Sequence, residues 1–320
     1  MSINLANKTE LLNYLKSNNL WAKKGLSQNF LVDREALDKI VEAAEIKGSD
    51  LIIEVGAGVG TLTVELVKRG SEVIAIELDN KLAELLNCSI VQLLGSVTSN
   101  SAIQQFSNEK LKVINADILK INLEELIGNR KYKVVANIPY AITSKILELF
   151  LSRNHKPEAM VMLVQKEVAE RICASPRPEN GRGKPGAMST LSVSVQLYGR
   201  PEIVDIVKAE SFFPAPKVDS AILRISNITT GHPEFISGSQ KIPDQVRNDN
   251  VFDEKTFFRC VHIGFASRRK TLLNNLSVGY QLDKEKVLAI LKSVGLGENV
   301  RAQELSVEEW KKLSSVIGKR

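Results

Sequence analysis

Short apolar runs alternate with turn residues along the first 225 positions of this 320-residue chain. Apolar and β-branched residues dominate four of these runs, at residues 51–55, 71–79, 111–119 and 131–140. Apolar residues at helical spacing, such as Leu62, Leu66 and Val67, follow the first run. Strands that alternate with helices predict a parallel sheet covered by helices. Three further strand-like runs bring the expected number of strands in this α/β domain to seven: residues 158–165, 201–210 and 218–225.

Helical periodicity marks both ends of the chain. An amphipathic helix is predicted from Thr9 to Leu20, and Asp33 is expected to cap the helix that follows. The stretch from Phe252 to Arg320 is predicted to be helical, and Ser306 with Glu309 fits a capping box at the start of its last helix. The C-terminal part is therefore expected to form a small helical domain.

Three glycines at alternate positions follow the first strand. The sequence LIIEVGAGVGTLT, residues 51–63, predicts a strand, a tight turn and a helix. Gly56, Gly58 and Gly60 allow left-handed torsions and close approach of a ligand, while the helix N-terminus offers it unpaired N–H groups. We expect a nucleotide-like ligand here. A tight turn without a ligand would leave the same pattern, and the GxGxG spacing differs from the GxGxxG of dinucleotide-binding proteins.

Acidic residues end the second and third strands. Glu77 lies about 20 residues beyond the glycine turn, where a carboxylate accepts hydrogen bonds from ribose hydroxyls in doubly wound sheets. Asp117 ends the third strand, where a carboxylate can accept a proton from an adenine amino group. The competing interpretations are a solvated carboxylate for Glu77 and a turn cap for Asp117. The chain has no GxxxxGK[ST] sequence after these strands, which argues against a nucleoside triphosphate.

The fourth strand runs into Asn137, Ile138, Pro139 and Tyr140. Pro139 ends the sheet pairing and holds Ile138 extended, so that the Ile138 carbonyl can accept a hydrogen bond. The Asn137 oxygen and this carbonyl can receive the two protons of an exocyclic amine, while Tyr140 offers a flat face for stacking. These residues predict a site for an amino group on a ring. A plain strand-end turn is the competing interpretation.

The composition is consistent with a basic surface and argues against several classes of protein. The formal charge of +6 permits a polyanionic partner, and Lys23 with Lys24 or the run Arg268, Arg269 and Lys270 could meet phosphates. Solvated basic turns would look the same. Three cysteines, odd in number and far apart, indicate neither a disulfide framework nor a zinc cluster. The N-terminus lacks a signal-like apolar core, and no apolar window reaches the length of a membrane span, so we expect a cytoplasmic protein. We also expect that it binds no metal.

Together the motifs resemble a known enzyme family. EVGAGVG, AIELD, NADIL and NIPY, in this order, look like the S-adenosylmethionine-dependent adenine-N6 methyltransferases. With WAKKGLSQNFLVD before them and VQKEVAERI, FFPAPKVDSAILRI and FASRRKTLLNNL behind, nearly the whole chain resembles the ribosomal RNA adenine dimethyltransferases that modify small-subunit RNA. The resemblance implies a Rossmann-like methyltransferase sheet of seven strands with helices on both faces, and an all-helical C-terminal RNA-binding domain.

The same resemblance assigns roles to individual residues. It implies S-adenosylmethionine as the cofactor. The implied cofactor-binding residues are Asn29 and Leu31 at the methionine end, Gly56 in the turn, Glu77 at the ribose, Asp117 at the adenine, and Asn137. The implied catalytic group is Asn137, Pro139, Tyr140 and Phe212, with Phe212 stacking on a flipped adenine opposite Tyr140. Burial of Phe212 in the core is the competing interpretation.

The expected partners are small-subunit ribosomal RNA and the immature small subunit, and the chain is expected to be a monomer. We predict a methyltransferase domain at residues 1–225, an exposed and disordered insertion at 226–250, and a helical RNA-binding domain at 251–320. The basic loop 174–190 could also meet RNA. There, Met188 and Ser189 stand where similar proteins usually carry Tyr-Gly, which affects how the loop packs.

Two alternative functions fit parts of the same pattern. A large-subunit ribosomal RNA methyltransferase of the antibiotic-resistance kind would share the first domain. The segments FFPAPKVDSAILRI and SRRKTLLNNL favour the small-subunit enzyme. A ribosome-assembly or transcription factor would keep the fold and use only its basic surface, but the intact Glu77, Asp117 and NIPY sequence argues against it.

Overall fold

The computed structural model describes residues 3–23, 25, 28–94, 110–176, 188–229 and 252–318. The chain divides into two compact units, Met1–Ala169 with Arg200–Ile228, and Glu170–Gly199 with Thr229–Arg320. Residues 170–199 thus join the C-terminal helices in this division. The domain limits expected from the sequence, 1–225 and 251–320, remain a prediction.

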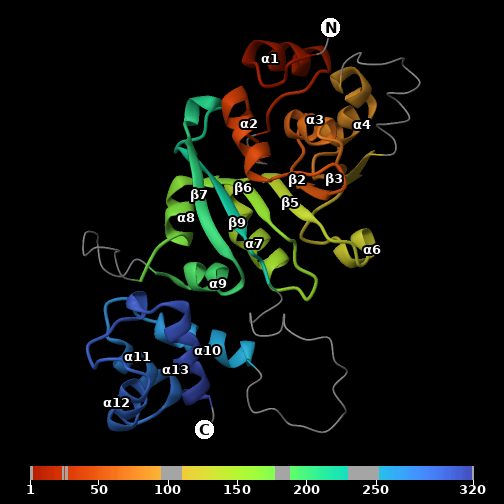
Figure 1. The fold of residues 1–320 in the computed structure, drawn as a ribbon. Helices are drawn as coiled ribbons and strands as arrows, with labels where there is room; N and C mark the ends of the chain where they lie inside the picture. The colour runs from red at the N-terminus through yellow and green to blue at the C-terminus, as the bar shows by residue number, and fades with distance from the viewer. Residues whose placement is uncertain are drawn as a thin grey trace, which may run out of the picture. The chain divides into compact units, whose positions relative to one another are not determined.

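The first unit is built on a seven-stranded sheet in the order β4-β3-β2-β5-β6-β9-β7 (Figure 1). Each pair from β4 to β6 is parallel, whereas β9 runs antiparallel to both β6 and β7. This mixed sheet confirms the seven strands expected from the sequence. The strands are β2 (Leu51–Val55), β3 (Glu72–Glu77), β4 (Leu111–Asn115), β5 (Lys133–Asn137), β6 (Met160–Gln165), β7 (Arg200–Val207) and β9 (Ser220–Ser226).

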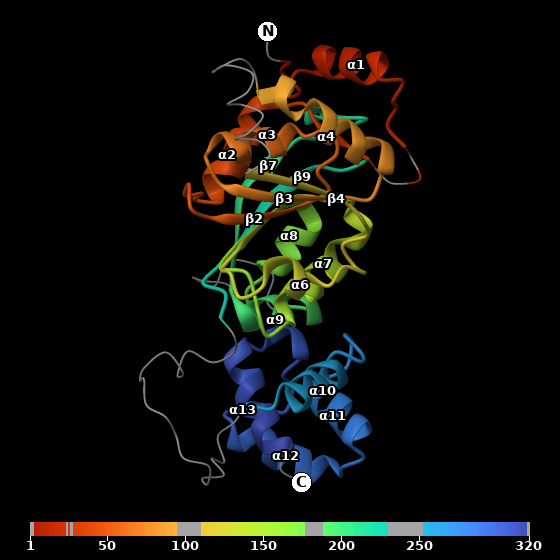
Figure 2. The same cartoon turned by 90° about the vertical axis from the view of Figure 1, so that its right-hand side faces the viewer.

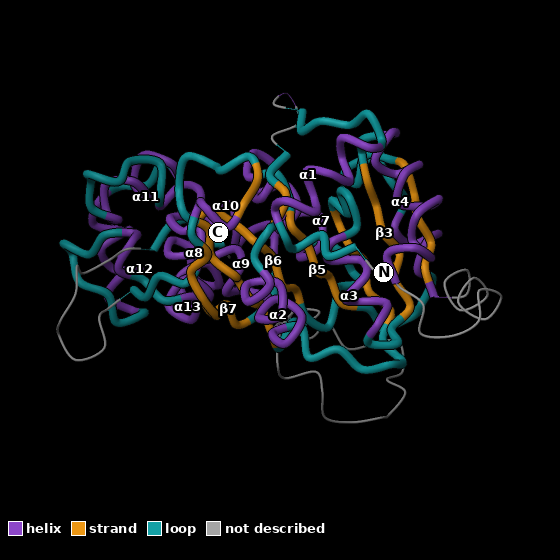
Figure 3. Tube along the Cα trace, turned by 90° about the horizontal axis from the view of Figure 1, so that it is seen from above, coloured by secondary structure: helices purple, strands orange, loops and turns teal. Residues whose placement is uncertain are grey.

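Helices cover both faces of this sheet, as Figures 1 and 2 show. On one face, α2, α3 and α4 pack on alternate strand residues such as Ile52, Val73 and Val135, which are fully buried. Seen from above, α3 and α4 lie along β3 (Figure 3). Helices α6 and α7 lie on the opposite face. The bounds are α1 (Lys8–Ser17), α2 (Arg34–Ala43), α3 (Thr61–Lys68), α4 (Asn80–Leu94), α6 (Leu123–Ile127) and α7 (Thr143–Leu151).

A second, two-stranded sheet joins distant parts of the first unit. Its strands β1 (Phe30–Leu31) and β8 (Phe212–Phe213) are antiparallel, with Leu31 opposite Phe212. The Ser211 hydroxyl donates to the Asp33 carboxylate over 2.6 Å just beyond this pairing. These contacts hold the segment before α2 against the segment before β9. The sequence did not predict this sheet, because two-residue strands carry no periodic signal.

Capping side chains define several helix starts. Asp33 accepts a hydrogen bond from the Ala36 backbone N–H at 3.1 Å, which confirms the predicted cap of α2. Ser306 and Glu309 form the predicted capping box of α13 (Val307–Ile317). These side chains satisfy backbone N–H groups that the first helical turn leaves without an intrahelical partner.

The second unit is helical. Its core gathers fully buried Phe257, Val261, Leu313 and Trp310 from α10 and α13, with parts of the other helices. The division between the two units falls within α8 (Lys166–Ile172). The remaining helices are α9 (Thr190–Tyr198), α10 (Glu254–Gly264), α11 (Leu272–Tyr280), α12 (Lys284–Ser293) and α13. The basic run Arg268, Arg269 and Lys270 is exposed in the turn between α10 and α11.

Met188 and Ser189 directly precede α9, and Ser189 is its N-cap. Met188 is 4% exposed and packs in the core of the second unit, while Ser189 forms a capping box with Ser192. The departure from Tyr-Gly therefore supplies a buried apolar contact and a helix cap. Helix α9 was not predicted, because its Thr and Val residues favour strands and its Ser residues favour helix caps and turns.

Some of the sequence-based expectations concern residues that lie outside the part of the chain that the structure describes. These are Lys24 and Ser27 of the basic turn, residues 177–187 of the basic loop and residues 230–250 of the insertion. None of the helices among the described residues has both the length and the apolar character needed to cross a membrane.

Candidate functional site: a cavity at the strand ends

A cavity lies at the carboxyl ends of β2, β3, β4 and β5, and its empty space is about 1100 Å³ when the open solvent at its mouth is included. Parallel strands bring their ends to one edge of a sheet, so residues far apart in sequence meet there. Of the nine cofactor-binding and catalytic residues that the resemblance implies, eight line this cavity: Asn29, Leu31, Gly56, Glu77, Asp117, Asn137, Pro139 and Tyr140. Phe212 does not belong to this lining.

The glycine turn forms the floor of the cavity between β2 and α3. Gly56, Gly58 and Gly60 all adopt positive φ angles, of 77°, 59° and 91°. A Cβ atom on Gly56 would lie only 3.1 Å from the Asn137 backbone oxygen, whereas one on Gly58 would make an ordinary contact, 3.4 Å from the Phe30 ring. The turn therefore needs glycine both for its torsions and for the space that it leaves open.

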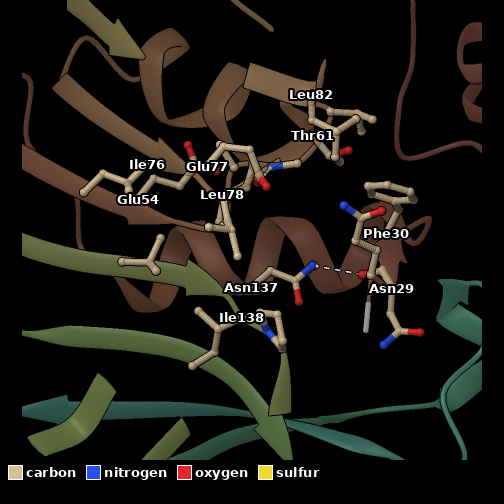
Figure 4. Close-up of a pocket in the computed structure, with 18 of the residues that line it drawn as sticks. Asn29, Phe30, Glu54, Thr61, Ile76, Glu77, Leu78, Leu82, Asn137 and Ile138 are labelled. Carbon is tan, nitrogen blue, oxygen red and sulfur yellow. Dashed lines mark hydrogen bonds between the residues drawn. The ribbon is translucent and has the colours of Figure 1, made fainter. Parts of the chain in front are cut away.

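Glu77 ties the end of β3 to the glycine turn. Its two carboxylate oxygens accept hydrogen bonds from the backbone N–H groups of Gly58, at 2.7 Å, and Asp79, at 2.8 Å. The side chain is 7% exposed and lies beside the cavity (Figure 4). Burial raises the pKa of Glu77, and these backbone donors oppose the rise. Two fixed oxygens with spare lone pairs suit a diol of the ribose type.

Asp79 anchors the segment that precedes β1. Lys23 forms an ion pair with Asp79 at 2.7 Å, and the Gln28 side chain donates to the same carboxylate at 3.2 Å. Burial alone would raise the pKa of Asp79, but Lys23 and Gln28 outweigh it and hold that pKa below its usual range. The tether keeps Gln28 and Asn29 at the cavity wall.

Asn137 faces this segment from the end of β5. Its Nδ2 donates to the backbone oxygen of Asn29 at 3.4 Å, as Figure 4 shows. The carboxamide oxygen is therefore turned away from Asn29 and can act as an acceptor. Thr143 holds the following turn by donating to the Tyr140 carbonyl at 3.0 Å. The structure thus brings the Asn137 amide and the Tyr140 ring to one cavity.

Asp117 both lines the cavity and caps its own turn. One carboxylate oxygen accepts from the Leu119 N–H at 3.0 Å, so the capping interpretation holds as well. Sequence reasoning missed two apolar neighbours that line the same cavity, Leu78 and Ile118. Leu78 is 56% exposed, which is unusual for leucine. The signal was an apolar residue directly after each of the acidic residues Glu77 and Asp117.

Phe212 lies in the core. It is 2% exposed, pairs with Leu31 across the small sheet and packs in the apolar cluster under α2 and α3. The adjoining Phe213 is half-buried. The described conformation therefore matches the competing interpretation, core burial, and stacking of Phe212 on a target base stays a prediction.

Glu54 is a buried carboxyl group that the sequence did not mark. It lines the cavity behind the glycine turn, is 1% exposed, and its Oε2 has no hydrogen-bond partner among the described residues. Burial raises the pKa of Glu54 to about 8, which Thr63 opposes and Glu77 reinforces. The sequence did not indicate a role for Glu54, because a single polar residue in an apolar strand carries no periodic signal.

Replacing Glu54 with glutamine should remove a pH dependence of stability. The folded-state pKa lies above the unfolded value, so the folded protein binds more protons and loses stability as pH rises from about 4.3 to 8. Glutamine mimics the protonated form. The unfolding free energy of Glu54→Gln, relative to wild type, should therefore rise with a slope approaching about 1.4 kcal/mol per pH unit.

Urea denaturation of both proteins between pH 5.5 and 8.5 measures this slope. Glu77 is retained in the variant, so its own raised pKa largely cancels in the comparison. A difference that stays constant over this range would show that Glu54 ionises normally in the folded protein.

Comparison with known proteins agrees with this site. The model of the family "Ribosomal RNA adenine dimethylase" matches residues 19–234. The chain is 41% identical over 295 residues to Ribosomal RNA small subunit methyltransferase A of Dehalococcoides mccartyi, covering 92% of this chain and 88% of that protein. The protein of the same name from Clostridium botulinum is 36% identical over 295 residues, covering 92% and 93%.

Two solved structures share the fold. A dimethyladenosine transferase from Plasmodium falciparum has a TM-score of 0.66 and 24% identity, over 90% of this chain and 97% of that one. The 23S rRNA methyltransferase ErmE has a TM-score of 0.61 and 25% identity, over 89% and 98%. The family match covers the glycine turn, both acidic strand ends and the segment from Asn137 to Tyr140, so this chain belongs to the ribosomal RNA adenine dimethylase family.

Proposed function

We propose that this chain transfers methyl groups from S-adenosylmethionine to the exocyclic N6 of adenines near the 3′ end of small-subunit ribosomal RNA, giving dimethyladenosine. One observation carries the proposal: a single cavity joins Glu77, Asp117 and Asn137 at three strand ends, with Tyr140 in its lining. The 41% identity to a small-subunit methyltransferase supports the choice of substrate. We infer that the enzyme acts as a cytoplasmic monomer during maturation of the small subunit.

The residues of the cavity fit this cofactor. Glu77 would hold the ribose hydroxyls and Asp117 the adenine amino group, and Asn29 and Leu31, which line the same cavity, would contact the methionine part. The glycine turn leaves room that any Cβ on Gly56 would reduce. When bound, the sulfonium group supplies an electrophilic methyl carbon.

Methyl transfer needs a nucleophilic nitrogen, and the adenine amine is a poor one because its lone pair is delocalised into the ring. The Asn137 oxygen and the Ile138 carbonyl would accept the two amine protons, which favours a pyramidal nitrogen. Tyr140 would stack on the base and fix its plane. The chain thus contributes orientation and hydrogen bonding; the product loses its proton readily without a strong base.

Incubation of the purified chain with labelled methyl donor and three substrates tests the choice of RNA. We expect label in unmodified small-subunit RNA or immature small subunits, and none in large-subunit RNA. Labelling of large-subunit RNA alone would favour a function like that of the ErmE structure, to which the fold is also similar. Cofactor binding with no label in any RNA would favour a non-catalytic assembly factor.

The exposed run Arg268, Arg269 and Lys270 is proposed to contact the RNA backbone. Replacing all three with alanine should weaken RNA binding and lower the slope of log K against log salt by about 2 to 3, because fewer counterions are released. Filter binding between 50 and 300 mM salt measures the slope. Replacing the exposed lysines of α12, Lys284, Lys286 and Lys292, removes the same charge and is the control; equal effects of both triples would refute a specific contact.

A further inference from the structure

The Tyr140 hydroxyl is anchored outside the cavity. It lies 2.6 Å from the Ser220 hydroxyl, in a hydrogen bond that joins residues 80 positions apart. Tyr140 is half-buried and lines the cavity, whereas Ser220 is fully buried and belongs to β9. Stacking on a base needs only the tyrosine ring. The hydrogen bond between the Tyr140 and Ser220 hydroxyls therefore points to a role other than contact with the base.

Ser220 is held by strand pairing on both of its sides. It is the first residue of β9, where it lies opposite Gln165 of β6 and Val207 of β7. The adjacent Asp219 accepts hydrogen bonds from the Ala209 backbone and the Lys208 side chain, each at 3.1 Å. The phenol oxygen of Tyr140 is thus attached to a strand end that is fixed on both sides.

The other end of Tyr140 is fixed through its backbone. Pro139 restricts the residue before it, the Ile142 N–H donates to the Pro139 carbonyl at 3.1 Å, and Thr143 donates to the Tyr140 carbonyl. With backbone and hydroxyl both held, the ring has little freedom to rotate about its side-chain torsions. A preorganised ring does not need to be ordered when the base arrives.

We propose that Ser220 is a positioning residue for methyl transfer: its hydroxyl fixes the plane of the Tyr140 ring, and thereby the plane of the target adenine. This rests on the proposed function of the cavity. Ser220 does not touch the cavity contents itself, since it is absent from the residues that line it. It accounts for the serine of the FFPAPKVDSAILRI segment, to which the sequence alone gives no role.

A double-mutant cycle on Tyr140→Phe and Ser220→Ala tests this inference. Each variant removes the same hydrogen bond from one side, so each should lower kcat about five- to tenfold, and the double variant should be no slower. The KM for S-adenosylmethionine and the affinity for RNA should change less than about twofold, because neither contact is altered. Ser71→Ala removes another fully buried serine hydroxyl, away from the cavity, and should leave kcat unchanged. Additive losses, or normal kcat in Ser220→Ala, would overturn the proposal.

Fluorine spectra give a second readout that needs no activity. The chain has five tyrosines, and in protein labelled with 3-fluorotyrosine the Tyr140 resonance is the one missing from Tyr140→Phe. In Ser220→Ala this resonance should shift and narrow as the ring is released. An unchanged resonance would contradict the anchoring. Absence of methylation by wild-type protein would instead count against the proposed function, since the spectra report on the contact by themselves.

Discussion

Replacing Asn137 with alanine is expected to lower methyl transfer by about 10²–10³-fold, because the amine then loses an acceptor that acts in the transition state. Asn137 reaches the cavity from the end of β5 and donates to the Asn29 carbonyl, which orients its oxygen. RNA binding should persist, since base orientation and backbone contact involve different surfaces. Single-turnover transfer and RNA binding measured on the same preparation separate the two effects.

Asn122→Ala is the control for this variant. Asn122 is an exposed asparagine that caps α6 and does not line the cavity, so its loss should leave transfer unchanged. If Asn137→Ala transferred methyl groups at the wild-type rate, the cavity would not be the catalytic site. If it lost RNA binding as well as transfer, Asn137 would serve the fold or the RNA interface more than the reaction.

Replacing Gly56 with alanine is expected to reduce both stability and cofactor binding. The positive φ of 77° should cost about 1–2 kcal/mol for any side chain. In addition, the new Cβ would lie 3.1 Å from the Asn137 backbone oxygen and would push that strand end away. A misplacement of about 1 Å can lower the rate about a hundredfold, so the smaller shift expected here should lower activity by less, about tenfold.

Gly295→Ala separates strain from displacement. Gly295 also has a positive φ, of 82°, but a Cβ atom there meets nothing within 4 Å. It should lose similar stability in urea denaturation while cofactor affinity, measured by calorimetry, stays normal. Equal cofactor affinity of Gly56→Ala and wild type would show that the glycine turn does not shape the cofactor site.

The main sheet could be predicted because its strands carry strong local signals. The seven apolar runs and the helical spacing of Leu62, Leu66 and Val67 give the alternation of strands and helices directly. The strand-end rule then placed Glu77, Asp117 and Asn137 together, and the structure finds all three in one cavity lining. Their individual roles stay predictions.

Contacts between distant residues could not be predicted in the same way. The pairing of Leu31 with Phe212 and the hydrogen bond between Tyr140 and Ser220 depend on tertiary packing, which local periodicity does not encode. Glu54 shows another limit: the apolar run at residues 51–55 predicted the strand that contains it, but not that this carboxyl group would be buried. For Phe212, the structure shows a side chain in the core, and the base-stacking role that the resemblance implied stays a prediction.

Mass analysis of nucleosides tests the central claim most directly. Unmodified small-subunit RNA or immature particles would be incubated with the chain and S-adenosylmethionine, digested, and compared with an Asn137→Ala reaction. The account predicts N6,N6-dimethyladenosine in the wild-type digest and little or none with the variant. A digest that contains only unmodified adenosine, although the chain still binds the cofactor, would contradict it.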